Sequence, residues 1–373
     1  MKLIEIDTED RRQVKQFLQL PFRIYLDIPQ WVPPLAPDAW RMLDKRRNPF
    51  FIHGQAALLL VVDDQNLAIG RLAVLNNQRY NEYNHEKTAF FYLFECENNQ
   101  EAACWLFEVA FQWARDQGLD TILGPKGFTV FDGVGMLVKG FEHRPAFSLP
   151  YNPPYYPELV EASGLEPAGE ILSGYLSSNM QFPERIYQVA RLIQERRDLH
   201  VANFKSRQDV RAFVPKLKDL FNGTLANMPG NVPITDEEVK ALEDQMIWFA
   251  NPRLIKIVYK GDQPVGFLLA YPDVSAAVQR TKGNVFPFGW IDMLLELRRT
   301  KWININGAGM LEGYRGLGGT ALLFSEMHRC VVDQGYIHAD LVQIGIENEK
   351  MQRELSNLGV DFYKTHRTYS RLL

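Results

Sequence analysis

The sequence is poor in cysteine, in net charge and in long apolar stretches. Its 373 residues include three cysteines, Cys96, Cys104 and Cys330, which are too few and too scattered for a disulfide framework or a zinc site. A net charge of −4 without a long basic run argues against broad nucleic-acid or anionic-membrane binding. The seven histidines show no ligand spacing, so no metal is expected.

Targeting signals are absent as well. The first ten residues have no signal-peptide apolar core, and no uninterrupted apolar stretch reaches the length of a membrane span. We therefore expect a cytoplasmic protein that does not insert in a membrane.

The length of the chain exceeds what one hydrophobic core supports. A composition of 46% hydrophobic and 23% charged residues is ordinary for a globular protein. The polar segment 177–184, which contains a proline, is the expected boundary. We predict two domains, residues 1–178 and 179–373.

The two halves show a similar order of apolar patterns. In the first half, the patterns predict strands at 3–6, 56–62, 67–75, 90–94, 121–124 and 170–176, with helices through 14–18 and over 101–117 and 155–164. In the second half, strands are predicted at 201–204, 254–259, 264–270, 302–308, 339–346 and 361–370, with helices at 185–197, 209–221, 235–249, 320–334 and 348–358. Thr235 and Glu238 have the spacing of a capping box. We expect an α/β fold class (α+β, with a mixed sheet), with a mostly antiparallel central sheet flanked by helices in each domain.

The most informative segment is the glycine-rich turn at 309–323, between a predicted strand and a predicted helix. It reads GMLEGYRGLGGTALL. Glycines allow positive φ and close approach to a ligand, and the first N–H groups of a helix lack partners and carry partial positive charge. The turn is therefore suited to a phosphate or pyrophosphate, although tight turns also use glycines without any ligand.

The segment from Arg315 to Thr320 resembles the pyrophosphate loop of the GNAT superfamily, the acyl-CoA-dependent N-acyltransferases, whose pattern is Arg/Gln-x-x-Gly-x-Gly/Ala. Arg315 and Gly318 match, and Thr320 replaces the usual Gly or Ala. Further on, Asn348 falls at the place of a family asparagine. The family tyrosine, seven residues later, is replaced by Leu355.

The resemblance implies roles for these residues. The pyrophosphate would be bound by Arg315, Gly316, Leu317, Gly318, Gly319 and Thr320. An N–H near Met310 or Leu311 would face the thioester carbonyl, and Asn348 would line the pantetheine.

Proton-transfer groups are harder to identify. Glu312 is a candidate base acting through water, or a loop carboxylate in solvent. Tyr363, His366 and Tyr369 on the last strand are candidate acids, or ordinary strand residues.

The corresponding turn of the first half, at 94–102, has three carboxylates and neither glycine nor arginine. Carboxylates there would repel a pyrophosphate, so we expect the first domain to have lost CoA binding. Two insertions leave alternatives open. Residues 124–157 would form a lid or acceptor-pocket wall, or a cover over the sheet; within 271–300, the apolar stretch 285–291 would line the pocket, contact the other domain or form a dimer surface.

Three functions remain in view. The leading one is transfer of an acetyl or longer acyl group from acyl-CoA to a small-molecule amine or amino acid, by a monomer or homodimer. The second is acyl-CoA binding without catalysis, and the third is an aminoacyl-tRNA-dependent peptidyltransferase, which the acidic balance disfavours. The whole pattern resembles uncharacterised bacterial tandem GNAT-like proteins.

Overall fold

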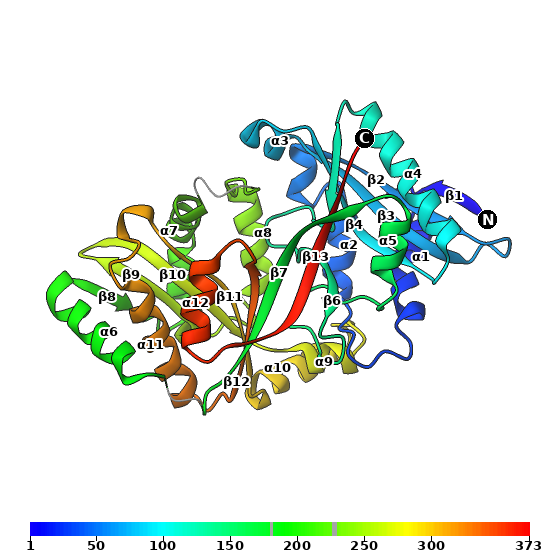
Figure 1. The fold of residues 1–373 in the computed structure, drawn as a ribbon. Coiled ribbons are helices and arrows are strands. Elements are labelled where there is room, and N and C mark those ends of the chain that lie inside the picture. Colours follow the sequence, from blue (N-terminus) through cyan, green and yellow to red (C-terminus); the bar gives the residue numbers. More distant parts are fainter. Residues whose placement is uncertain (180–181, 226–229) are drawn as a thin grey trace. The chain divides into compact units, whose positions relative to one another are not determined.

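The computed structural model describes residues 1–179, 182–225 and 230–373 (Figure 1). The chain forms two compact units. The first unit comprises Met1–Leu172, Ser275–Trp290 and Lys364–Leu373, and the second comprises Ser173–Val274 and Ile291–Tyr363. The expected boundary segment 177–184 includes residues 180 and 181, which lie outside the described residues, so the predicted division at 178/179 stays a prediction.

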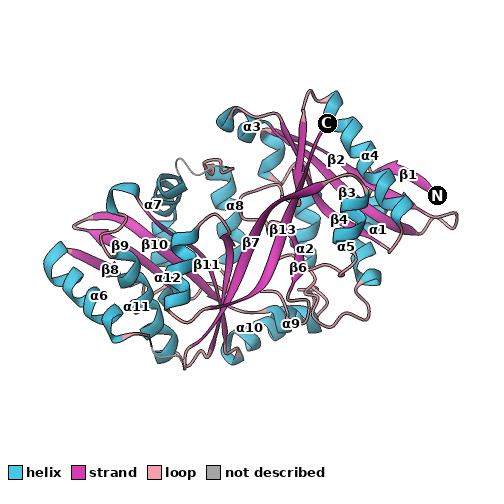
Figure 2. Cartoon of the chain, in the orientation of Figure 1, coloured by secondary structure: helices cyan, strands magenta, loops and turns pink. Residues whose placement is uncertain are grey.

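The first unit is built on a mixed sheet (Figure 2). Its strands, in spatial order, are β1 (Lys2–Glu5), β2 (Gly54–Val62), β3 (Ala68–Asn77), β4 (Thr88–Cys96), β5 (Thr121–Gly124) and β13 (Asp361–Leu372, from Lys364), and β6 (Met136–Lys139) also pairs with β13. The β4–β5 pair is parallel, whereas the pairs β1–β2, β2–β3, β3–β4, β5–β13 and β6–β13 are antiparallel.

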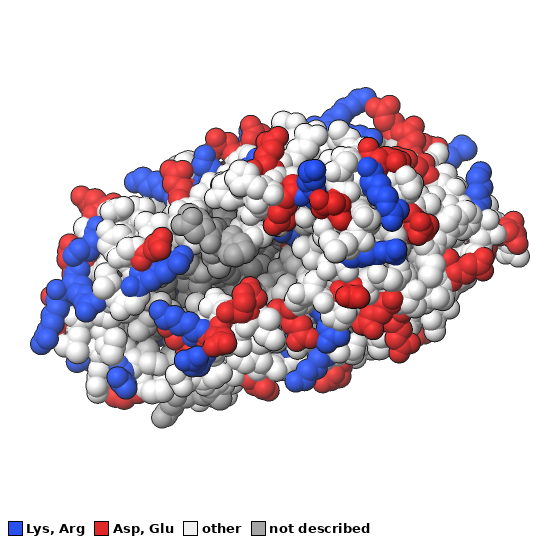
Figure 3. All heavy atoms as spheres, turned by 45° about the horizontal axis from the view of Figure 1, so that its top comes forward, with Lys and Arg blue, Asp and Glu red and all other residues white. Residues whose placement is uncertain are grey.

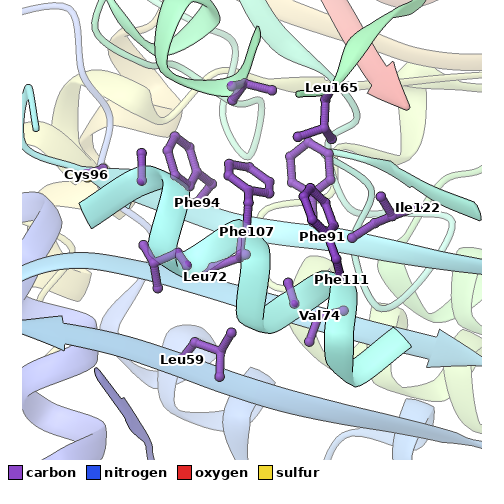
Figure 4. Close-up of a cluster of buried hydrophobic side chains, with 14 of the residues drawn as sticks. Leu59, Leu72, Val74, Phe91, Phe94, Cys96, Phe107, Phe111, Ile122 and Leu165 are labelled. Atoms are coloured by element: carbon purple, nitrogen blue, oxygen red, sulfur yellow. The ribbon is translucent and has the colours of Figure 1, made fainter. Parts of the chain in front are cut away.

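One helix, α4 (Gln100–Asp116), forms the core of this unit against the sheet. Its buried residues recur at helical spacing, and Phe107 packs on Phe91 and Phe94 with ring centroids 5.2 and 5.1 Å apart (Figure 4). The other helices of the unit are α1 (Arg11–Ile24), α2 (Ala36–Leu43), α3 (Gln78–Asn84), α5 (Tyr156–Ala162) and α9 (Ser275–Arg280).

The second unit is also built on a mixed arrangement of strands. Its strands, in spatial order, are β7 (Glu166–Ser177, from Ser173), β12 (His338–Gly345), β11 (Trp302–Met310), β10 (Gln263–Pro272), β9 (Ile255–Lys260) and β8 (Leu199–Ala202). Its helices are α6 (Glu184–Arg197), α7 (Arg207–Leu225), α8 (Asp236–Met246), α11 (Gly319–Asp333), α12 (Glu349–Asn357) and most of α10 (Gly289–Arg299). The parallel pairs β4–β5 and β11–β12 make the sheet mixed, as expected. They correct only its description as mostly antiparallel.

Neighbouring residues of a strand point to opposite faces, and the second unit covers both. Val258 and Leu268 lie in the core formed with α6 and α11. Ile257 and Phe267, one residue before each, pack with Phe213 of α7. Helices therefore cover β9 and β10 on both faces.

A β-bulge interrupts the pairing of β4 with β3 in the first unit. Arg71 pairs with Glu95 and Ala73 with Tyr92, so β4 has one more residue than β3 between these pairs. Leu93, inside the bulge, has a φ of 52°. The parallel pairing of β4 with β5 covers only residues 88–90 of β4, before the bulge.

The second unit repeats this device in β11. Leu268 pairs with Ala308 and Ala270 with Ile305, so β11 carries one extra residue, and Gly307 there has a φ of 106°. Parallel pairing with β12 again ends before the bulge, at Ile305. The two residues with positive φ, Leu93 and Gly307, each lie three residues before the last residue of their strand. The repeated order predicted from sequence is therefore confirmed at the level of a local backbone feature.

Most predicted elements are present, including the Thr235–Glu238 capping box. The sequence patterns missed α2, α3, α9, α10 and β6. These are short or lie in segments rich in proline and glycine, where periodicity is weak.

Candidate functional site

The predicted glycine turn connects β11 to α11 in the second unit. After Met310 the chain makes one 3₁₀ turn, Glu312–Tyr314, and α11 begins at Gly319. Gly318 precedes the helix with a φ of 88°, and a Cβ there would overlap the side chain of Ile193 on α6. Gly316 has a φ of 75° and faces open space. The turn is thus closely packed on one side and accessible on the other.

The N-terminus of α11 carries no cap from its own side chains. The N–H of Leu322 donates to the oxygen of Gly318 at 3.2 Å. The N–H groups of residues 319–321 come before this bond in the helix, at positions that have no intrahelical carbonyl partner. Gly318 has no side chain to accept from them, and the first turn holds no acidic residue. Such an end attracts an anion.

The corresponding helix of the first unit, α4, is satisfied internally. The Asn99 side chain accepts a hydrogen bond from the N–H of Ala102 at 3.1 Å, and Glu101 places a carboxylate in the first turn. A side-chain cap and a nearby negative charge occupy the site that an anion would use. This contrast supports the prediction that only the second unit binds CoA.

Arg315 folds back on the turn. Its Nε donates to the oxygen of Met310 at 3.1 Å and its Nη2 to the oxygen of Thr224 at 2.9 Å. Arg197 of α6 donates to the oxygen of Leu317 at 2.9 Å. Arg315 therefore holds the turn against β11 and α7; its direct contact with a pyrophosphate stays a prediction.

The bulge of β11 lies where β11 and β12 cease to pair. Asn306, just before Gly307, is exposed. The N–H of Leu311, by contrast, donates to the oxygen of Val265 at 2.9 Å. That bond satisfies the Leu311 N–H within the sheet, and Met310 is buried in the core. Which N–H group faces a thioester carbonyl stays a prediction.

A buried polar group lies across the paired part of these strands. Asn304 of β11 and Asp340 of β12 are register partners, 1% and 2% exposed. The Asn304 Nδ2 donates to Asp273 Oδ1 at 3.1 Å. Burial, followed by the charge of Asp340 and a hydrogen bond to it, raises the pKa of Tyr363 well above its usual range, so the phenol stays protonated.

Aromatic residues of β7, β11 and β12 lie close to this polar group. The Tyr175 hydroxyl lies 2.7 Å from His338 Nδ1, and Trp302 stacks on the His338 ring with centroids 4.5 Å apart. Burial lowers the pKa of His338, which favours the neutral imidazole. Sequence reasoning missed Asp273, Asn304, Asp340 and His338. The available signal was a polar residue at alternate positions of two otherwise apolar strands.

The remaining predicted residues are dispersed. Glu312 is exposed on the 3₁₀ turn. Tyr369 is fully buried in the core of the first unit, where burial raises its pKa to about 12. This placement favours an ordinary core residue, so of the three candidate acids only Tyr363 lies in the second unit.

Asn348 is the N-cap of α12, where its side chain accepts from the N–H of Met351 at 3.2 Å. Leu355, seven residues on, is buried in the core of the second unit. The structure therefore gives Asn348 a capping role; its contact with pantetheine stays a prediction.

The chain is similar in sequence to two curated bacterial proteins. No family model matches the chain. Protein YghO from Escherichia coli K12 is 24% identical over 371 residues, covering 97% of this chain and 93% of its own. The bacterial ceramide synthase of Caulobacter vibrioides is also 24% identical over 371 residues, covering 97% and 95%.

Among solved structures, a tandem GNAT protein from the clavulanic acid biosynthesis pathway, without acetyl-CoA, matches 100% of this chain and 98% of its own. The TM-score is 0.56 at 11% sequence identity. The chain therefore has the tandem GNAT fold that the sequence indicated.

Three further features concern metal binding, membrane-spanning helices and surface charge. Within the described ranges, no cluster of three or more His, Cys, Asp or Glu side chains could hold a metal ion. Across the same part of the chain, every helix is too short or too polar to span a bilayer. On the face in Figure 3, basic and acidic side chains are interspersed.

Proposed function

We propose that the second unit transfers an acyl group from acyl-CoA to an amine. The observation that carries this proposal is the combination of a bulged strand that parts from its neighbour with an uncapped helix N-terminus directly after it. Acyl-CoA has a matching polarity along its length: an anionic pyrophosphate, an extended pantetheine and a thioester carbonyl.

Each part of the donor has a counterpart in these elements. The N–H groups at the start of α11, with the Thr320 hydroxyl, bind the pyrophosphate. The pantetheine extends between the diverging ends of β11 and β12. The thioester carbonyl approaches the bulge at Asn306 and Gly307, where backbone N–H groups stabilise the oxyanion that develops on that oxygen.

The acceptor amine must lose a proton, and the CoA thiolate must gain one or leave as an anion. Asp340 is a carboxylate one strand from the bulge, and the Tyr363 phenol, kept protonated, is a donor beside it. We assign proton acceptance from the amine to Asp340 and hydrogen bonding of the reacting group to Tyr363. Glu312, exposed on the 3₁₀ turn, stays the alternative candidate base, acting through water.

The relative named a bacterial ceramide synthase, similar over almost the whole chain, suggests the acceptor class. A ceramide is the fatty amide of a long-chain amino alcohol. We therefore propose a long-chain amino alcohol as acceptor and a fatty acyl-CoA as donor.

The test is formation of the amide. Purified protein is incubated with palmitoyl-CoA and sphinganine, amide is measured by mass spectrometry and free CoA by thiol titration. Amide and CoA in equal amounts are expected, and Asp340→Asn should lower kcat by about 10²–10⁴-fold with little change in KM. Tyr363→Phe should lower kcat less, because it removes one hydrogen-bond donor and leaves the carboxylate.

A second function is favoured by one residue. Leu355, at the position of the family's usual acid, is buried among apolar side chains, as in a protein that binds acyl-CoA without turnover. Tight acyl-CoA binding with no amide formed, across amines of different length, would replace the catalytic proposal with this one.

A further inference from the structure

Large apolar side chains are exposed along one continuous segment, residues 286–295, which we call the apolar segment. It contains six of the seventeen exposed large hydrophobic residues of the described chain. They are Phe286 (75% exposed), Phe288 (73%), Trp290 (45%), Ile291 (41%), Leu294 (42%) and Leu295 (37%). Scattered single residues of this kind need no explanation, but a contiguous patch marks an interaction surface.

The second half of this segment lies on helix α10, which is yellow in Figure 1. Ile291, Leu294 and Leu295 follow the i, i+3, i+4 spacing of one helix face. Met293, which points elsewhere, is fully buried and anchors the helix. A helix that needed only to cover the protein would carry polar residues on its exposed face.

Basic residues flank the apolar segment. Arg280 and Lys282 precede it, and Arg298, Arg299 and Lys301 follow it, against two acidic residues within it or on α10, Asp292 and Glu296. The segment from 280 to 301 therefore carries a net charge of +3 although the whole chain is at −4. Because charges are screened over about 10 Å, a nearby surface responds to this local charge more than to the total.

A cavity of about 640 Å³ in the first unit adjoins Phe286. Its lining includes three arginines, Arg11, Arg41 and Arg47, together with Trp40. The Arg11 guanidinium lies 5.5 Å above the Trp40 ring. Asp44, which also lines it, is 3.5 Å from Arg47. The cavity thus combines positive charge with apolar surface, which suits an anionic group attached to a hydrocarbon chain.

We propose that the apolar segment inserts into an anionic lipid surface and that the cavity beside Phe286 accepts a lipid phosphate head group. Aromatic and aliphatic residues on one face with flanking arginine and lysine are typical of helices that lie in a membrane interface, and anionic lipids attract the cations. This goes beyond the proposed acyl transfer and does not depend on it. It is opposed to our expectation from net charge that the protein avoids anionic membranes, and the experiment below decides between the two.

The experiment is vesicle flotation of the full-length protein. Vesicles of phosphatidylcholine alone are compared with vesicles containing about 30% phosphatidylglycerol, at low and high salt. Binding is expected only with the anionic vesicles and should weaken with salt.

Three variants locate the surface. The double change Phe288→Ser with Trp290→Ser should weaken binding at least about tenfold, since two exposed apolar side chains lose their transfer from water. Arg41→Gln, in the cavity, should weaken binding to the anionic vesicles. The matched control is Ile52→Ser, which alters an equally exposed residue (73%) of the first unit and should bind like the wild type.

Two results would overturn the proposal: equal binding to both vesicle types, or unchanged binding of the double variant. A dimer in solution that the double variant dissociates would assign the segment to a second copy instead, and would also overturn it. Acyl transfer to detergent-dispersed sphinganine without vesicles, measured on the same variants, should be unaffected, so that failure of membrane binding and failure of catalysis are seen separately.

Discussion

The substitution Thr320→Glu tests whether the α11 N-terminus is the pyrophosphate site. Thr320 is half-buried in the first turn of the helix. A glutamate there gives this unit the negative charge that Glu101 gives the corresponding helix of the first unit. The carboxylate interacts favourably with the helix dipole, by about 0.3–1 kcal/mol, while it repels a bound pyrophosphate.

The expected effects on stability therefore have opposite signs without and with ligand. A ligand at one hundred times its Kd adds about 2.7 kcal/mol to wild-type stability, or about 5–10 °C in Tm for a domain of this size. Thr320→Glu should equal or slightly exceed the wild-type Tm without ligand and lose the shift with palmitoyl-CoA. A variant that lost binding through misfolding would lower the unliganded Tm, so this combination excludes misfolding as the cause.

The assay is a thermal-shift titration with palmitoyl-CoA and acetyl-CoA. Thr320→Gln is the matched control, because it has similar size without the charge and should keep most of the shift. A full shift in Thr320→Glu would show that CoA does not contact this helix end. An equal loss in both variants would show that side-chain size, and not charge, is responsible, and would refute the electrostatic reasoning.

Three further substitutions test the first unit, each by urea unfolding. Asn99→Ala removes the cap of α4 and should cost about 1 kcal/mol while leaving the acyl-CoA shift intact; loss of that shift would contradict the assignment of CoA to the second unit. Burial lowers the pKa of His366 to about 4, below the unfolded value of about 6.5, so its contribution is present above pH 6.5 and about 3 kcal/mol is lost as the pH falls to 4. His366→Gln should remove that part of the pH dependence, and an identical pH profile in both proteins would contradict it. The Gln279 amide donates to the oxygens of Pro29 and Trp31 at 2.8 and 2.9 Å, so Gln279→Ala should cost about 1–3 kcal/mol, and no change would show that these bonds do not hold the 275–290 segment in its unit.

The sequence predicted the strand, the glycine turn and the following helix because each has a strong local signal. Trp302, Ile303 and Ile305 are apolar before the turn. Glycines supply positive φ at Gly316 and Gly318, and the apolar period resumes after Thr320. The capping box at Thr235 likewise depends on residues only three positions apart. Local rules are sufficient where the determining contacts are local.

The proton-transfer residues could not be selected in the same way. Tyr363 and Tyr369 occupy the same strand and look alike in sequence, but the chain passes from the second unit to the first between them, at Lys364. Asp340 becomes a candidate only through its pairing with Asn304, thirty-six positions away. The Leu311 N–H donates to the oxygen of Val265, and this bond also depends on strand register. Such contacts follow from tertiary pairing, which alternation of apolar residues does not specify.

The two units share a bulged strand and differ at the helix N-terminus that follows it. Both retain a bulged strand that parts from its parallel neighbour, and both follow it with a helix. In the second unit glycine leaves the helix end open; in the first, Asn99 caps it. Close to the first bulge, Glu95 is buried, accepts hydrogen bonds from Tyr25 and Tyr156 at 2.7 and 2.8 Å, and lies 3.5 Å from Arg71. Internal groups thus provide the charge and hydrogen bonds that a bound cofactor would otherwise supply. A bulged strand is part of the core in both units, whereas the proposed CoA site needs unsatisfied donors, which the described N-terminus of α11 offers and that of α4 does not.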